Sequence, residues 1–174
     1  MLNSRKNPGL NVQINPLLNI QINPRFNGQI NPHFNAQLNP RFNALINPEC
    51  NGQINPTVNE QINPQINEGL NPELNAKIDP QLNSHINPRV NPNSDGLCFF
   101  DLHNQLIGFS VHAELNTMIV FDLDGIVTSL CVQFSGGYAV FDWKSLEQSN
   151  YLISDGQVGF NQFSLDGWWI GHAK

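Results

Sequence analysis

The sequence contains few charged residues. Asp, Glu, Lys and Arg make up 13% of the 174 residues, about half of the share that is usual in soluble proteins. Only 8 Lys and Arg stand against 14 Asp and Glu, and the basic residues form no patch. Binding to nucleic acid is therefore not expected, because contacts to phosphates need a concentrated positive surface.

Cysteine and long apolar runs are also scarce. Cys50, Cys98 and Cys131 show neither a CxxC pair nor metal-ligand spacing, so we expect small buried hydrophobic residues in a reducing compartment. No apolar run is long enough to span a membrane. The first ten residues lack the apolar centre of a signal peptide, which predicts a cytoplasmic protein, while export without a leader stays open.

The first half of the chain, residues 2–92, is an internal repeat with a period of four residues. The first position of each tetrad is apolar except at Lys6, and the second is Asn except at Asp79. Pro occupies the third position of alternate tetrads from Pro8 to Pro88. The full unit is therefore an octad of the form φ-Asn-x-Gln-φ-Asn-Pro-x, in which φ is an apolar residue.

The octad argues against both a helix and a flat strand. Each interior Pro costs an α-helix about 3 kcal/mol, and central strands do not tolerate Pro. Asn-Pro instead favours turns between short extended pieces. We expect a β-solenoid in which every φ residue points inward and stacked Asn side chains form ladders, a logic that resembles that of pentapeptide-repeat proteins. The alternative is an open or disordered spiral of turns without a packed core.

The second half, residues 96–174, carries a longer repeat. Four stretches align, about 21 residues apart, on the aromatic anchors Phe100, Phe121, Phe141 and Phe163. An Asp-Gly pair such as Asp124-Gly125 between apolar runs predicts a β-hairpin with a type I′ turn. We expect an antiparallel meander of about eight strands that forms a small barrel or two packed sheets. The strands are expected near 97–102, 105–112, 117–123, 126–134, 138–143, 149–154, 158–165 and 168–173.

One of these stretches, IVFDLDGIVTS at residues 119–129, resembles the first motif of the haloacid dehalogenase-like phosphatases. The resemblance implies a nucleophile at Asp122, a proton-handling Asp124 and a bridging Mg²⁺. We do not expect this activity, because sister stretches repeat the motif as hairpin turns. The chain also lacks the family's α/β pattern and later acidic pair, and Ile126 stands where that family usually has Thr.

The candidate binding residues are Trp168 and Trp169. Successive strand residues point to opposite faces, so we expect one of them in the core and the other exposed, as a surface for a sugar or a protein partner. No metal site is predicted. Weak candidates for Ca²⁺ are turn aspartates that would gather at one rim if the hairpins repeat in space, namely Asp101, Asp122, Asp124, Asp142 and Asp166.

The sequence as a whole predicts an all-β protein without enzymatic activity or a cofactor. The preferred function is a spacer or self-assembling scaffold, in which residues 2–92 associate and residues 96–174 form a β head. The competing hypothesis is a ligand-binding module whose C-terminal domain recognises a glycan or a protein. An enzyme would need a convergent polar site that the sequence does not contain.

Overall fold

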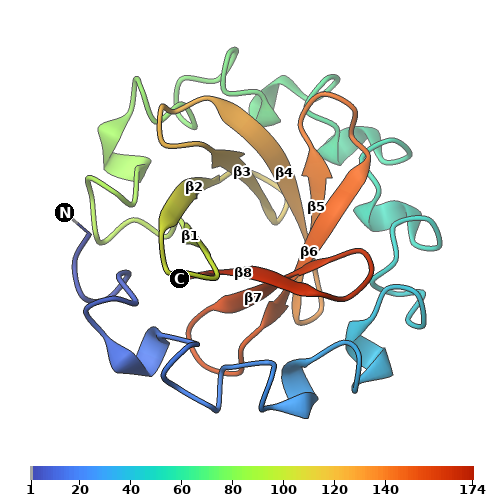
Figure 1. Ribbon diagram of the computed structural model, residues 1–174. Helices are drawn as coiled ribbons and strands as arrows, with labels where there is room; N and C mark the ends of the chain where they lie inside the picture. The colour runs from blue at the N-terminus through green and yellow to red at the C-terminus, as the bar shows by residue number, and fades with distance from the viewer. Residues whose placement is uncertain (1) are drawn as a thin grey trace.

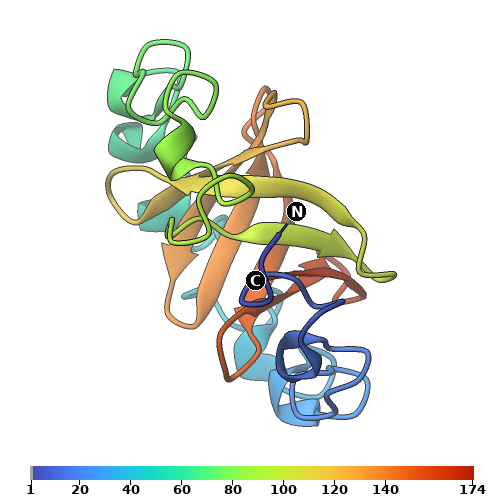
Figure 2. The ribbon, with the colours of Figure 1, turned by 90° about the vertical axis from the view of Figure 1, so that its left-hand side faces the viewer.

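The structure is a computed structural model that describes residues 2–174. Eight antiparallel strands close into a barrel, and the N-terminal half of the chain runs around this barrel (Figure 1). We call residues 2–96 the belt. In the view turned by 90°, the blue N-terminal repeats lie at the lower right and the green repeats at the upper left, so the belt runs obliquely around the barrel (Figure 2).

The strands follow one another around the barrel in chain order, and β1 pairs with β8 to close it. They are β1 (Cys98–Asp101), β2 (Leu106–His112), β3 (Thr117–Phe121), β4 (Val127–Phe134), β5 (Gly137–Asp142), β6 (Gln148–Ser154), β7 (Phe160–Ser164) and β8 (Trp169–Ala173). The structure thus confirms the predicted all-β fold and its hairpin-connected strands. Of the two predicted arrangements, it shows the barrel.

Both faces of the barrel wall are apolar. Met118 and Val120 of β3 belong to the cluster inside the barrel, whereas Ile119 and Phe121 belong to a cluster that the wall shares with the belt. All five residues of β3 are therefore buried. A strand that is buried on both faces has a nearly continuous apolar sequence, rather than one that alternates with polar residues.

Each octad of the belt folds into two turns. The Asn-Pro half forms a turn closed by a backbone hydrogen bond between successive asparagines, as from Asn27 N–H to the Asn23 carbonyl (2.9 Å). The other half forms a single turn of 3₁₀ helix in seven octads. These helices are η1 (Val12–Ile14), η2 (Gly28–Ile30), η3 (Ala36–Leu38), η4 (Gly52–Ile54), η5 (Glu60–Ile62), η6 (Glu68–Leu70) and η7 (Ser84–Ile86).

The repeated asparagines connect these turns to one another. Asn27 Oδ1 accepts a hydrogen bond from the Gln29 N–H (3.1 Å), and Asn27 Nδ2 donates one to the Gln21 carbonyl (2.6 Å). The second bond, which reaches back six residues, recurs at every eighth residue from Asn19 to Asn91. The asparagines therefore link each octad to the preceding one along the chain, instead of forming the expected ladders between stacked rungs.

The structure does not show the expected solenoid, because only one of the two φ residues in each octad points inward. This inner row consists of Ile14, Ile22, Ile30, Leu38, Ile46, Ile54, Ile62, Leu70, Ile78 and Ile86, of which Leu38 and Ile86 are partly buried. From Leu38 to Ile86 the row packs with residues of the barrel wall in one apolar cluster. The prolines from Pro8 to Pro88 are buried as well. The solenoid would have needed to supply its own core, whereas the belt shares a core with the barrel.

The hairpins that follow the aromatic anchors differ from the predicted type I′ turns. A type I′ turn needs two residues with positive φ, but two of these hairpins have only Gly125 (82°) and Gly167 (85°). A β-bulge falls at the anchor in all four hairpins. One left-handed residue together with a bulge is typical of longer hairpin loops. Two adjacent positive φ angles occur instead at Leu115 and Asn116, between β2 and β3.

Candidate functional site

The turn aspartates lie at one rim of the barrel, and three of the five, Asp101, Asp122 and Asp142, accept hydrogen bonds from the backbone of their own turns. Asp122 Oδ1 accepts hydrogen bonds from the N–H groups of Asp124 and Ile126, both at 2.9 Å. Asp101 and Asp142 each accept two hydrogen bonds from backbone N–H groups of their own turns, and these bonds lower the pKa of both carboxyls. Within residues 2–174, no three His, Cys, Asp or Glu side chains are placed to share a metal ion. The candidate aspartates are therefore not brought together as a site.

The same rim holds the belt through the residues that follow its prolines. Arg41 forms an ion pair with Asp166, the last of the candidate aspartates. Gln65 Nε2 donates a hydrogen bond to the Lys144 carbonyl (3.1 Å), and Arg89 donates one to the carbonyl of Leu123. Because these contacts are exposed, we expect them to fix the position of the belt rather than to contribute much free energy.

The outer φ residues of the belt form a row of exposed apolar side chains, which we call the ridge. It consists of Leu10, Leu18, Phe26, Phe34, Phe42, Val58, Ile66, Leu74, Leu82 and Val90, with exposed fractions from 58% to 78%. Cys50 occupies the same position of its octad and is also exposed. Single exposed apolar residues are common on proteins, but a row that follows the belt around the molecule is not.

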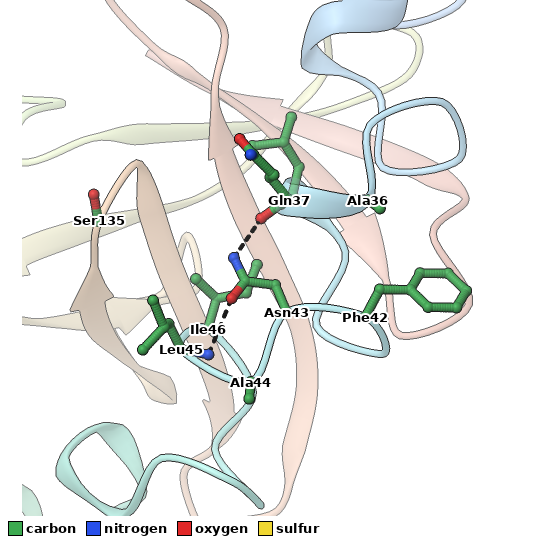
Figure 3. Close-up of a pocket in the computed structure, with 9 residues that line it drawn as sticks. Ala36, Gln37, Phe42, Asn43, Ala44, Leu45, Ile46 and Ser135 are labelled. Carbon is green, nitrogen blue, oxygen red and sulfur yellow. Dashed lines mark hydrogen bonds between the residues drawn. The ribbon is translucent and has the colours of Figure 1, made fainter.

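A hollow of about 620 Å³ lies beside the ridge, between residues 36–46 of the belt and the β4–β5 turn (Figure 3). Figure 3 shows Leu45 and Ile46 on the side of Ser135, while Phe42 points away from them. Leu45 stands where most octads have Gln, and it is 74% exposed. The lining has no ionisable side chain. The hollow therefore offers apolar contact rather than chemistry.

Trp168 and Trp169 line a second hollow, of about 420 Å³, between the belt and the β7–β8 turn. We call it the aromatic pocket. Trp168 is 66% exposed, whereas Trp169 is partly buried against the core shared with the belt. The ring centroid of His33 lies 4.9 Å from that of Trp168. The Arg25 guanidinium lies 5.3 Å from the Trp169 ring centroid, and Phe34 completes the aromatic lining.

The belt side of this pocket was not predicted from the sequence. Arg25, His33 and Phe34 are separated from the two tryptophans by more than a hundred residues, and no local pattern relates them. One signal was available, because three successive ridge positions carry Phe, whereas most other octads have an aliphatic residue there. An aromatic run at a surface position is typical of a binding surface.

A buried polar cluster joins the barrel to the first octads of the belt. His172 Nε2 is 2.8 Å from Asn104 Oδ1, and Asn104 Nδ2 donates a hydrogen bond to Asn15 Oδ1 (3.1 Å). Asn161 Nδ2 donates one to the Ile22 carbonyl (2.9 Å). Burial lowers the pKa of His172 to about 3, and the Lys174 charge adds to this shift against the opposing effects of Asp155 and Asp101.

Because His172 is buried, we expect the protein to lose stability as the pH is lowered from 7 to 5. His172 binds a proton near pH 6.5 in the unfolded chain but only near pH 3 in the folded protein. The unfolded state therefore binds more protons in this interval, and the free energy of unfolding falls as the pH falls, by about 2 kcal/mol. Urea denaturation at several pH values measures how steeply the free energy of unfolding changes with pH.

The matched variant for this prediction is His172→Gln, which has no titrating group but retains an amide nitrogen to donate to Asn104. Its unfolding free energy should be nearly independent of pH between 7 and 5, because most carboxylates titrate at lower pH in both states. Equal slopes for the variant and the natural protein would show that His172 is not the group responsible.

No helix within residues 2–174 has the length and apolar character needed to cross a membrane. No protein-family model matches the chain, and no curated protein and no solved structure is significantly similar to it.

Proposed function

We propose that this protein is a self-assembling structural module, in which the ridge of one copy packs against the ridge of another. The observation that carries this proposal is the row of ten large apolar side chains, each more than half exposed, which recur every eight residues except where Cys50 takes the position. A row of exposed large apolar side chains favours an interaction site. Packing two ridges together would remove these side chains from water, which stabilises the assembly.

The charge distribution supports association through the belt. The belt, residues 2–96, contains six Lys and Arg and six Asp and Glu, a net charge of zero, whereas residues 97–174 contain two and eight, a net charge of −6. Two barrels would repel each other, but two belts would not. The barrel is also closed by the β1–β8 pairing, so it offers no free strand edge for sheet extension. The belt is therefore the favourable surface for a second copy.

The test is the mass of the protein over a concentration series, measured by sedimentation and small-angle X-ray scattering. The natural protein should grow beyond its monomer mass of 19.5 kDa as its concentration rises. The triple variant Phe42→Ser, Ile66→Ser and Leu82→Ser should associate at least about 100-fold more weakly, because it removes three exposed apolar side chains.

A matched control changes three exposed belt residues of the polar row, Gln29→Ser, Gln53→Ser and Gln61→Ser, and should associate like the natural protein. Circular dichroism establishes that both variants are folded. A natural protein that stays monomeric at every concentration would overturn the proposal, and so would equal association of the two variants.

A further inference from the structure

The aromatic pocket has hydrogen-bond donors but no carboxylate in its lining. Arg25 makes no ion pair and its guanidinium makes no hydrogen bond within residues 2–174. Asn31 and His33 add side chains that can donate hydrogen bonds to the lining. Asp166, next to the lining residue Gly167, is already paired with Arg41. A ligand for this pocket must therefore bring its own acceptors, and a negative charge among them would balance Arg25.

The walls of the pocket are suited to a ligand ring that stacks on an aromatic side chain with one side and stays in contact with water on the other. Phe34 is 78% exposed and Trp168 is 66% exposed, so a ring stacked on either of them keeps its other face or its edge in water. A pyranose has this character, because its C–H face packs on aromatic rings while its hydroxyl groups stay solvated. The volume of about 420 Å³ falls within the usual range for small-ligand sites.

The number of charges in the pocket favours a carboxylate over a phosphate. Arg25 is the one permanently charged side chain of the lining. A guanidinium pairs with a carboxylate through two parallel hydrogen bonds, and the single positive charge of the guanidinium balances the single negative charge of the carboxylate. A phosphate near pH 7 carries up to two charges, and the net charge of −6 of the chain opposes a more highly charged ligand.

We propose that the aromatic pocket binds a carboxylate-bearing sugar ring, such as a uronic acid residue. The ring packs on Trp168 and Phe34, and the carboxylate pairs with the guanidinium of Arg25. This activity is separate from self-assembly. Phe34 belongs to both surfaces, so the variants that test the two proposals leave it unchanged.

The experiment is a titration of the full-length Trp143→Phe protein, in which tryptophan fluorescence reports only on Trp168 and Trp169. Trigalacturonate should quench or shift this fluorescence with a Kd below about 1 mM, and calorimetry should give the same Kd. The methyl ester of the same trisaccharide, which lacks the charge, should bind about tenfold or more weakly. Benzoate and adenosine monophosphate test a carboxylated aromatic ring and a phosphate.

Arg25→Gln and Trp168→Ala should each weaken trigalacturonate binding about tenfold or more, since they remove the charge and the stacking surface. Arg5→Gln removes an exposed belt arginine outside the pocket and should leave the Kd unchanged. Absence of trigalacturonate binding, equal binding of the ester, or tighter binding of benzoate or adenosine monophosphate would each overturn the proposal. Binding that survives both pocket substitutions would also overturn it.

Discussion

Replacing Leu70 by Ala should lower the free energy of unfolding by about 2–5 kcal/mol, whereas Leu74→Ala should change it by less than about 0.5 kcal/mol. Both are leucines of the belt, and they lie four residues apart in successive tetrads. Leu70 is fully buried in the core that the belt shares with the barrel wall, so its truncation leaves a cavity. Leu74 belongs to the ridge and is 65% exposed, so its truncation leaves none.

Urea denaturation at low protein concentration measures this difference without a contribution from association. Tryptophan fluorescence reports on the barrel, where all three tryptophans lie, and far-ultraviolet circular dichroism reports on the whole chain. Because belt and barrel share one core, we expect the two signals to show one common transition. A similar loss of unfolding free energy for the two substitutions would contradict the assignment of Leu70 to a buried inner row and of Leu74 to an exposed outer row. A solenoid would bury both leucines alike.

The barrel could be predicted from the sequence because its signals are local. The aromatic anchors recur about every 21 residues, and turn residues separate short apolar runs at regular intervals. Each hairpin is thus specified by residues within its own stretch. The turn type was not specified in this way, because Asp-Gly occurs both in type I′ turns and in longer loops with a bulge. The bulges at the anchors decide between the two.

The belt could not be predicted as easily, because its burial depends on a partner distant in sequence. A period of four treats both φ residues of the octad as equivalent, yet only the one before Asn-Pro is buried. The sequence does distinguish the two rows: from Ile14 to Ile86 the inner row contains only Ile and Leu, whereas the outer row also contains Phe, Val and Cys. A surface packed on a fixed wall restricts side-chain shape in this way, and an exposed one does not.

The candidate site shows the same division between local and distant information. Trp168 and Trp169 can be predicted as candidate binding residues, because neighbouring aromatic residues of one strand cannot both point inward. Arg25 and His33, which give the aromatic pocket its positive and donor character, depend on where the belt crosses the β7–β8 turn. Aspartates in turns are possible Ca²⁺ ligands in a sequence, but the Asp side chain also accepts hydrogen bonds from the backbone of its own turn.

Asp155→Ala should destabilise the protein by about 3–5 kcal/mol, because it leaves the Lys174 ammonium buried without its counter-charge. Both side chains of this ion pair are almost completely buried, with exposed fractions of 0% and 1%. Burial lowers the pKa of Lys174, and the Asp155 carboxylate opposes that shift. The backbone of Lys174 also pairs with Cys98 next to the β1–β8 junction, so the ion pair stabilises the closure of the barrel.

Two further variants separate the ion pair from the turn that Asp155 also holds. Asp155 Oδ1 accepts hydrogen bonds from the N–H groups of Gln157 (2.8 Å) and Gly159 (3.1 Å). Asp155→Asn retains an oxygen for these bonds but lacks the charge, so it isolates the contribution of the ion pair. Adding Lys174→Met to either variant should recover much of the loss, because it removes the unpaired buried charge. If Lys174→Met gave no recovery, the turn, rather than the charge pair, would account for the stability that Asp155 contributes.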